Sequence, residues 1–313
     1  MTVATPTPSV CVLVLNYNGV PHLQDCLSTL VRAAARAGVP CPIVLVDNRS
    51  PDASVAFTRQ RFPDVEIVVT PRNDFLFSLN DVVAARREDV VVIVNNDMRF
   101  DDQFIAPLLA HFAADDVFGV GAAILDWEGA IDTVGPRCAR VHHWWFYKWW
   151  SFERQQPALT LDACGGAAAY RRTMFVELGG FDPLYRPGYY EDLDLSYRAW
   201  AFGWKVLYEP RSRAFHKTSQ SMLARYGDTG KARLLYRNHV LFTAKNIGGA
   251  GFLIGFLLTL PFRALRPLLR GYRVPFFGFL EALPALPLAL RRRFSATRRR
   301  VDLSRFAQVT LLP

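Results

Sequence analysis

The segment VVVIVNND (residues 90–97) changes chemistry abruptly, and it decides how the rest of the chain is interpreted. Its first five residues are apolar and β-branched, which predicts a strand buried on both faces. Asn95, Asn96 and Asp97 follow without a spacer. Open α/β sheets bind ligands beyond the carboxyl ends of their strands, so these amides and this carboxylate are placed to contact a ligand.

Three further apolar runs precede this segment, and helical patterns separate them. The runs that predict strands are VCVLVL, PIVLV and VEIVV at residues 10–15, 42–46 and 65–69. The stretches with helix-like spacing are residues 21–37, 51–62 and 78–87. Alternation of this kind is typical of βαβ units. We therefore predict an α/β fold with a Rossmann-like, mainly parallel sheet and helices on both faces.

All four predicted strands end in loops rich in Asn and Asp, namely NYNG, DNRSPDAS, TPRND and NND. Asp47 directly ends a buried strand, where its carboxylate can accept a hydrogen bond from a nucleobase N–H. Asn16 fits either a ligand contact or a turn. Asn18 and Asp52 fit turn or cap positions better than ligand positions.

The composition favours a folded, enzyme-sized protein. The chain has 313 residues, of which 51% are apolar, and 13% are aromatic. It has five cysteines without C-x-x-C spacing, which argues against a disulfide framework or a zinc site and favours a reducing compartment. The first ten residues lack a basic region and a long apolar run, so we expect no signal peptide.

Positive charge is concentrated at the end of the chain. From residue 259 onward there are eleven arginines and two acids, which accounts for the whole net charge of +9. A neutral body with a basic, apolar tail favours an anionic membrane surface over nucleic acid as partner. The arginines at 263, 266, 270 and 273 have helical spacing, which predicts one charged helical face. We expect residues 247–313 to form a helical tail in the headgroup layer, with a soluble helical subdomain as the alternative.

Six motifs together resemble family 2 glycosyltransferases, particularly the bacterial rhamnosyltransferase-like branch. In chain order they are VLNYNG, VLVDNRSPDAS, VVVIVNND, GGAAAYRR, LGGFD and YYEDLDLSYRAWAFGWKV. The resemblance implies a GT-A fold over residues 1–246, with a nucleotide-sugar-binding half (1–100) and an acceptor and catalytic half (101–246). It also implies inverting transfer of a sugar from a nucleotide-diphosphate donor to a hydroxyl of a glycan or lipid-linked acceptor in cell-envelope polysaccharide synthesis. The first guess for the donor is dTDP-rhamnose or a UDP-sugar.

The same resemblance assigns a metal site to the end of the fourth strand. Asp97 stands at the last position of the family's D-x-D motif, where the acid engages Mg²⁺ or Mn²⁺ bridging the donor diphosphate. One carboxylate suffices, because hard cations take phosphate oxygens and water as their other ligands. Asn95 replaces the first acid, which leaves metal dependence open. Asn96 is expected to contact sugar or ribose hydroxyls, and His216 to be a further metal ligand, although a lone histidine also has a structural explanation.

A second acidic cluster supplies the candidate base. Inverting transfer needs a carboxylate that removes the proton from the acceptor hydroxyl. The match to the family's E-D motif makes Asp192 the candidate, with Glu191 as the fallback. For Asp194 we favour a structural role at a helix N-terminus.

The third loop departs from the family pattern. The stretch NDFLFSLN keeps Asn73 and Asn80, which we assign to the donor site, but puts Phe75 where glycine is usual. A bulky aromatic adopts positive φ less cheaply than glycine does. We therefore expect this loop to take another shape.

The acceptor site is expected at Gly165, Gly166 and the aromatic stretch VHHWWFYKWW. We expect Trp144 and Trp145 to contact acceptor or lipid, with a packed cover over the sheet as the alternative. A cytoplasmic enzyme associated peripherally with the inner face of the cell membrane fits all these assignments. The alternative is a catalytically weak GT-A-fold subunit for sugar binding or assembly.

Overall fold

The computed structural model describes residues 7–129, 132–151, 155–217, 220–294, 301–308 and 310–312. Three of the tail arginines, Arg298, Arg299 and Arg300, lie outside these ranges.

The first half of the chain forms the predicted parallel sheet. Its strands are β1 (Val10–Asn16), β2 (Ile43–Asp47), β3 (Glu66–Val69) and β4 (Val90–Asn95), in the spatial order β3-β2-β1-β4. The connecting helices are α1 (Val20–Ala35), α2 (Ser54–Arg61) and α3 (Leu79–Ala85), with a 3₁₀ turn η1 (Phe75–Ser78) before α3. Asn16 pairs with Asp47 and Leu15 with Asn95, so β1, β2 and β4 end at one edge of the sheet.

Beyond β4 the sheet becomes mixed. The next strands in space are β11 (Ala167–Arg171), β6 (Val117–Asp126), β12 (Lys205–His216), β10 (Ala158–Leu159) and β13 (Thr310–Leu311). Of these neighbours only β6 and β12 run parallel. Two short strands pair antiparallel at the margin, β5 (Met98–Phe100) with β12 and β7 (Asp132–Val134) with β6. The α/β fold is thus confirmed, and its parallel part lies in the half that we predicted to bind the nucleotide-sugar.

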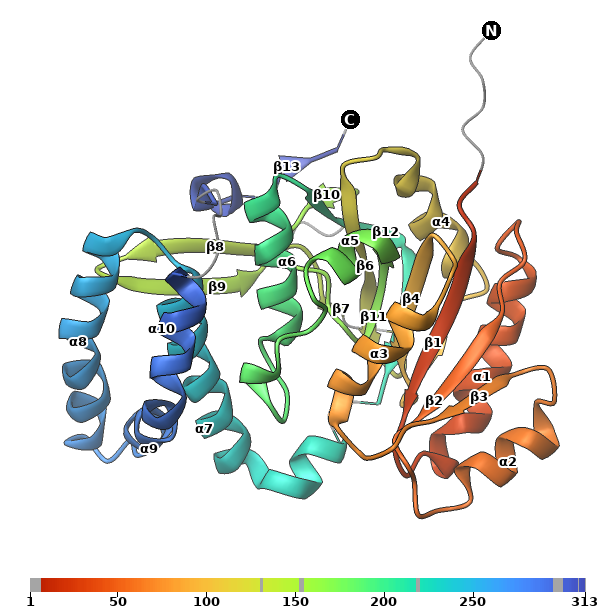
Figure 1. Ribbon diagram of the computed structural model, residues 1–313, viewed down its shortest axis with the longest axis horizontal. Coiled ribbons are helices and arrows are strands. Elements are labelled where there is room, and N and C mark those ends of the chain that lie inside the picture. Colours follow the sequence, from red (N-terminus) through yellow and green to blue (C-terminus); the bar gives the residue numbers. More distant parts are fainter. Residues whose placement is uncertain are drawn as a thin grey trace, which may run out of the picture.

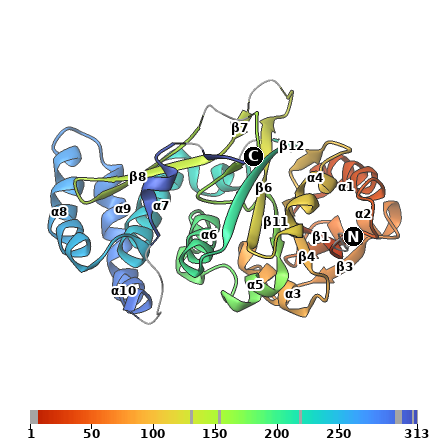
Figure 2. The ribbon, with the colours of Figure 1, turned by 90° about the horizontal axis from the view of Figure 1, so that it is seen from above.

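Both faces of the sheet are covered, because successive side chains of a strand point to opposite faces. Along β4, Val91 and Ile93 join one hydrophobic cluster, and Val90, Val92 and Val94 join the other. The helices α1 and α4 (Ile105–Ala110) cover one face. The helices α3, α5 (Arg172–Glu177) and α6 (Glu191–Phe202) cover the opposite one (Figure 2).

The tail forms a layer of helices beside the sheet (Figure 1). The tail contributes α8 (Ala250–Leu268), α9 (Val274–Ala282) and α10 (Leu286–Phe294) to this layer, and α7 (Gln220–Asn246), which precedes the tail and is interrupted at Gly227, completes it. The buried Asn238 amide on α7 donates to three backbone carbonyls just before α6, those of Tyr185, Gly188 and Tyr189. The helix α7 is therefore fixed to the segment that precedes α6.

The end of the tail returns to the main sheet. The 3₁₀ turn η5 (Leu303–Phe306) buries Phe306, whose ring lies 5.1 Å from that of Trp200. The strand β13 then pairs with β10. The helical layer therefore extends across the boundary that we predicted at residue 246, because α7 packs with α9 and α10, and the last residues belong to the main sheet.

A two-stranded ribbon reaches from the sheet to α8 (Figures 1 and 2). It consists of β8 (Arg137–His142) and β9 (Trp145–Trp150). The two turn residues, His143 and Trp144, both have positive φ, as a two-residue hairpin turn of type I′ requires. A non-glycine residue with positive φ costs roughly 1–2 kcal/mol relative to glycine in the same conformation.

Candidate active site

The ends of β1, β2 and β4 bring three predicted donor-site residues together. The Asn16 amide donates to Asp47 (2.7 Å), and the Asn96 amide donates to Asn16 Oδ1 (2.6 Å). Ser50 also donates to Asp47 through both its hydroxyl and its backbone N–H. Because Asp47 is only 1% exposed, a nucleobase contact requires this carboxylate to exchange partners, and the contact stays a prediction.

Two neighbouring residues serve the turns, as predicted. Asn18 has a φ of 53°. Asp52 accepts from the backbone N–H of Ser54 at the start of α2 and from that of Val20 at the start of α1. These contacts hold the two loops next to each other.

The loop after β3 differs from our expectation. Phe75 does adopt the positive φ (54°) that its place in the motif demands, so the inference that the loop must take another shape was wrong. Asn48 compensates by donating to the Phe75 carbonyl (2.6 Å), and Asn73 accepts from the Phe75 N–H (3.0 Å). Asn73 thus shapes the loop.

Asn80 has a structural use rather than the donor contact that we expected. Its amide donates to the carbonyl of Phe181 (2.9 Å) and accepts from the Phe181 N–H (2.8 Å). Both ends of the side chain are therefore occupied by backbone. The pairing ties α3 to the LGGFD segment that precedes the acidic cluster.

Asp97 and His216 meet at the end of β12. The His216 Nε2 lies 3.3 Å from Asp97 Oδ2, while Asp97 Oδ1 is buried and has no hydrogen-bond partner. A buried carboxylate oxygen without a partner is costly, and a divalent cation would satisfy it. Among the described residues no third His, Cys, Asp or Glu completes a ligand cluster here. The pair fits a cation whose other ligands are diphosphate oxygens and water.

The acidic cluster follows a strained turn. Tyr189 and Tyr190 have φ values of 68° and 75°, and α6 begins directly afterward with Glu191. Consecutive non-glycine residues at positive φ persist only where the surroundings enforce them, and such strain gathers at functional sites. The turn places Glu191 and Asp192 in the first turn of α6.

Two glycines bring this cluster to the end of β4. The Asn95 N–H donates to the Gly166 carbonyl (3.0 Å), and the Gly165 N–H donates to Asp192 (3.4 Å). A Cβ at Gly166 would come within 3.0 Å of the Asn95 amide. The absence of a side chain at Gly166 therefore lets the two motifs, about 95 residues apart in sequence, share one edge, whereas a Cβ at Gly165 would make an ordinary 3.5 Å contact with Asp192. Neither glycine contacts anything that identifies it as an acceptor ligand.

The two acids have different environments. Burial raises the pKa of Glu191 well above its ordinary value, and the charge of Asp192 raises it further. Glu191 Oε2 is buried without a hydrogen-bond partner. Asp192, in contrast, accepts from the backbone N–H groups of Gly165 and Leu193. Burial and the neighbouring carboxylate therefore favour the protonated form of Glu191.

Asp194 is structural, as we favoured. It is fully buried and accepts from Tyr185, Arg198, Lys245 and Asn246. Burial alone would raise its pKa, but the charges of Lys245 and Arg198 lower it below the ordinary range. The network joins α6 to α7.

The aromatic ribbon combines packing with one unpredicted cation. Trp145 stacks on His239 of α7 (4.5 Å between ring centres), while Trp144 is 47% exposed. Trp145 therefore serves as packing, which was our alternative for this stretch. Lys148 lies over the Tyr190 ring (4.4 Å), beside the strained turn, and sequence analysis missed it because the aromatic residues around it dominate the pattern.

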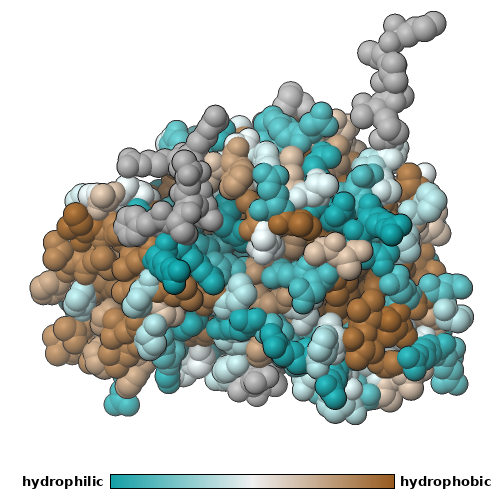
Figure 3. Space-filling model, in the orientation of Figure 1, coloured by the Kyte–Doolittle hydropathy of each residue, from teal (hydrophilic) through white to brown (hydrophobic). Residues whose placement is uncertain are grey.

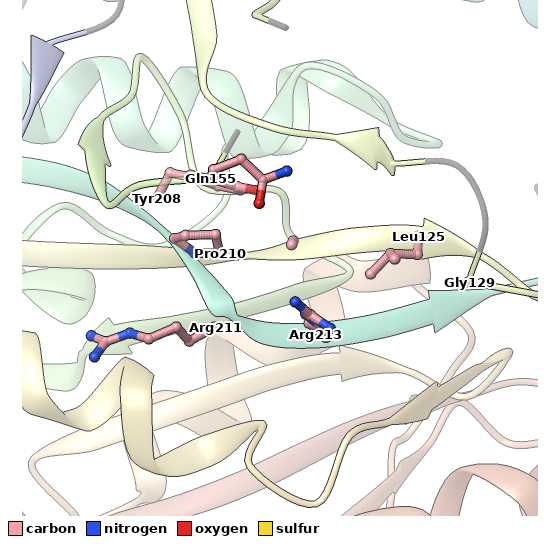
Figure 4. A pocket seen from close by; sticks show the side chains of 8 residues that line it. Leu125, Gly129, Gln155, Tyr208, Pro210, Arg211 and Arg213 are labelled. Atoms are coloured by element: carbon pink, nitrogen blue, oxygen red, sulfur yellow. The ribbon is translucent and has the colours of Figure 1, made fainter. Parts of the chain in front are cut away.

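One cavity of about 260 Å³ lies elsewhere, over the paired strands β6 and β12. Figure 4 shows its lining, which includes Gln155, Arg211 and Arg213. It contains none of the predicted site residues. We assign it no role.

The chain is similar to known glycosyltransferases in sequence and in fold. The chain is 26% identical over 238 residues to the N-acetylglucosaminyl-diphospho-decaprenol L-rhamnosyltransferase of Mycobacterium tuberculosis, in each of two strains. The match covers 67% of this chain and 76% of that protein.

Solved structures share the fold. GalNAc-T7 with UDP, GalNAc and Mn²⁺ has a TM-score of 0.57 at 17% identity, and the match covers 86% of this chain but 58% of that one. The mannosyltransferase PcManGT from Pyrobaculum calidifontis, with GDP-Man and Mn²⁺, has a TM-score of 0.57 at 15% identity, with 93% and 88% covered. TarS 1–349 of S. aureus has a TM-score of 0.54 at 13% identity, with 90% and 81% covered.

The family comparison covers the parallel strands β1 to β4 and the two glycines Gly165 and Gly166. The model for "Glycosyl transferase family 2" matches residues 11–179, which is more than half of the chain. The protein therefore belongs to glycosyltransferase family 2 and is a glycosyltransferase of the rhamnosyltransferase-like branch with a GT-A fold.

Proposed function

We propose that this protein transfers a sugar, with inversion, from a nucleotide-diphosphate donor to a hydroxyl of a lipid-linked glycan acceptor. One observation carries the proposal: the Asp97–His216 pair and the Glu191–Asp192 pair share one edge of the sheet. The first pair suits a diphosphate leaving group, and the second suits removal of a proton. A donor sugar between them would have its leaving group and its attacking hydroxyl on opposite sides.

Asp192 is the base in this proposal. It takes the proton of the acceptor hydroxyl, whose oxygen forms the new bond to the anomeric carbon while the bond to the diphosphate breaks. The electron pair of that bond leaves with the nucleoside diphosphate. The neighbouring Glu191 stays neutral because of burial, so it does not add a second negative charge near the departing diphosphate.

Asp97 and His216 would hold Mg²⁺ or Mn²⁺, and Asp97 Oδ1 is the open ligand position. When bound, the cation stabilises negative charge on the leaving diphosphate. Asn16 and Asn96 form the wall beside it and are suited to donor hydroxyls. For the donor we propose dTDP-rhamnose first and a UDP-sugar second, because the mycobacterial relative is named as an L-rhamnosyltransferase.

The outer face of α8 supports a membrane-bound acceptor. Its inner face is buried, whereas an apolar stripe on the outer face is exposed (Figure 3, left). The stripe consists of Ile254, Leu258, Phe262, Leu265 and Leu269, with Phe262 75% and Leu269 87% exposed. Contiguous exposed apolar surface of this kind marks a contact with membrane or protein.

The structure corrects our view of the arginines. The helix α8 ends at Leu268, so Arg270 and Arg273 lie beyond it, and Arg263 turns inward to the carbonyl of His143. The four arginines therefore do not share one helical face. Two helical segments are long and apolar enough to cross a membrane: α8 (Ala250–Leu268), and Val274–Arg293, which runs through α9 and α10. This is weak evidence for a membrane contact.

We infer that the tail lies on the cytoplasmic face of the membrane. The helix α9 packs on both α7 and α8, and α7 is held on the catalytic half by Asn238 and Lys245. This attachment leaves α8 exposed on one side only. An interfacial position presents the outer stripe to lipid and keeps the acidic cluster in water.

Titration calorimetry with UDP, dTDP and GDP tests the donor assignment. Each is titrated with Mn²⁺ and then with EDTA, into wild type and Asp97→Ala. We expect one nucleotide to bind with a dependence on both the cation and Asp97. Folded wild type that binds none of the three would exclude the donor assignment and favour a sugar-binding or assembly subunit.

Flotation with phosphatidylglycerol vesicles tests the membrane assignment. We expect Leu258→Glu with Phe262→Glu to lose vesicle binding, because charge cannot enter the acyl boundary cheaply. Val31→Glu, at a 45% exposed valine on α1, is the matched control and should float like wild type. Unchanged flotation of the double variant would contradict the assignment. Point variants are preferable to truncation, because removal of residues 247–313 also removes the buried Phe306.

A further inference from the structure

The ribbon β8–β9 links the acidic cluster to the lipid-facing helix. At its far end, the Trp144 ring covers Gly255 of α8, where a Cβ would come within 2.4 Å of the indole. At its near end, Lys148 lies over the Tyr190 ring, directly before Glu191. Four residue steps separate Lys148 from Trp144, which corresponds to about 13 Å along the ribbon. The ribbon is therefore the path that we expect for an acceptor that joins a membrane to Asp192.

Lys148 has an unusual environment for a lysine. Among the described residues, no carboxylate forms an ion pair with its ammonium. Burial, and to a smaller extent the charge of Arg137, lower the pKa of Lys148, whereas the carboxylates of Asp162 and Asp192 raise it; together they bring the pKa to about 7. A cation kept close to the base without a salt-bridge partner is available for an anion.

Three further donors without partners lie beyond Lys148, on α7 and α8. They are His239 Nε2, Tyr236 Oη and Arg263 Nε, all buried and without hydrogen bonds at these atoms. Tyr190 and His239 Nδ1 share a hydrogen bond (2.8 Å), and with Tyr190 as the donor the imidazole proton is on Nε2. Unsatisfied buried polar groups are rare in proteins, and three in one cluster call for an explanation.

These groups surround the ring of Trp145. His239 stacks on it at 4.5 Å, the Arg263 guanidinium lies 4.9 Å from its centre, and the Tyr236 ring lies at 6.0 Å. Burial lowers the pKa of His239 most, and the charges of Lys148 and Arg263 lower it further, so the imidazole lies within reach of both charges. Within the described part of the chain, Arg263 has no acidic partner. The cluster is cationic and rich in N–H and O–H donors.

We propose that Lys148, His239, Arg263 and Tyr236 form a binding site for the diphosphate of a polyprenyl-diphosphate-linked acceptor. The inference rests on the proposed function and specifies the acceptor of that same site. In this arrangement the acceptor sugar lies at Asp192, the diphosphate lies along β9, and the polyprenyl chain leaves over α8. Diphosphate oxygens accept from several cationic and neutral donors at once, which satisfies the four groups together.

Calorimetric titration with farnesyl diphosphate in EDTA tests the site, because chelation removes the cation on which diphosphate binding at Asp97 is proposed to depend. We expect Lys148→Met and Arg263→Met each to weaken binding about tenfold or more, since a charge-assisted hydrogen bond is lost. Lys148→Arg should retain most of the affinity. Arg87→Met, which removes an exposed arginine distant in the chain from the ribbon, is the matched control and should bind like wild type.

Other ligands distinguish binding of the diphosphate from binding of the isoprenoid chain or of a lipid headgroup. Farnesol should bind at least tenfold more weakly than farnesyl diphosphate, and inorganic pyrophosphate should compete with it. Flotation with phosphatidylglycerol vesicles should not change in Lys148→Met. The proposal is overturned if farnesyl diphosphate does not bind wild type, if both Met variants bind it normally, or if Lys148→Met loses vesicle binding instead.

Nucleotide titration with Mn²⁺ on the same variants distinguishes failure of this diphosphate site from failure of the proposed function. Lys148→Met and Arg263→Met should bind the nucleotide like wild type, which also shows that they are folded. Nucleotide binding without farnesyl diphosphate binding would overturn only the diphosphate site. Farnesyl diphosphate binding without nucleotide binding would support the site and exclude the glycosyl transfer proposal.

Discussion

Replacement of Gly19 by alanine is the most direct test of the donor edge. Gly19 is buried between β1 and α1, and an added Cβ would lie 1.9 Å from Asn16 Oδ1 and 2.2 Å from Asn96 Nδ2. Its φ of −98° and ψ of 2° are accessible to alanine, so backbone strain is not involved. The methyl group would occupy the position of the Asn16–Asn96 hydrogen bond.

The expected cost follows from these distances. Carbon contacts are normal at about 3.5 Å, so both amides must move by more than about 1 Å. Overpacking costs about 1–3 kcal/mol, and loss of the 2.6 Å hydrogen bond adds about 1 kcal/mol. We expect the free energy of unfolding to fall by about 2–4 kcal/mol in urea titrations. Donor nucleotide affinity should fall at least tenfold, because Asn96 leaves its place.

Gly251→Ala is the matched control. A Cβ there meets nothing within 4 Å, and the residue lies within α8, so we expect unchanged nucleotide binding and up to about 1 kcal/mol of added stability. If Gly19→Ala matches wild type in both stability and nucleotide affinity, the Asn16–Asn96 contact is refuted. If only stability falls, Asn96 is not a donor ligand. Asn96→Ala answers the second question should Gly19→Ala fail to fold.

Three further predictions concern the acids and the buried charges. Glu191→Gln should retain transfer within about tenfold, because burial already favours its neutral form, whereas Asp192→Asn should abolish transfer and keep nucleotide affinity. Equal loss of transfer and of nucleotide affinity in Asp192→Asn would refute Asp192 as the base, and loss of transfer in Glu191→Gln alone would assign the base to Glu191. Lys245→Met should cost about 3–5 kcal/mol in urea titrations, since it leaves buried Asp194 without its ammonium, and a loss below 1 kcal/mol would contradict this account. Burial lowers the pKa of His239 to about 3, so between about pH 6.5 and 3 the unfolded chain binds a proton that the folded chain does not, and stability falls as pH falls. From pH 7 to 5, wild type should lose about 2 kcal/mol more than His239→Leu, and parallel pH profiles would exclude this origin.

The strand exits were predictable from sequence because local chemistry determines them. A β-branched run followed by NND leaves few alternatives, and β1, β2 and β4 end within a residue of the predicted positions. The cap role of Asp52 and the turn role of Asn18 are equally local. Parallel strands then bring their exits to one edge as a consequence of topology.

Contacts between distant segments were not predictable in this way. Nothing near Asn80 in sequence indicates that its amide pairs with the Phe181 backbone, 101 residues away. The positive φ of Phe75 depends on a hydrogen bond from Asn48, so a propensity argument based on the loop alone gave the wrong result. Tertiary contacts outweighed local preference in both cases.

The tail connects membrane attachment to the orientation of the active site. Asn238 fixes α7 to the strained turn before Glu191, and Lys245 pairs with Asp182 and Asp194 on either side of it. A helix attached at both places cannot tilt without moving the base. Because α9 packs between α7 and α8, the proposed lipid contact at the outer stripe would fix the height of the acidic cluster above the membrane. The end of the chain also pairs with the main sheet through β13, so packed elements rather than a linker would set the distance from lipid to the proposed base.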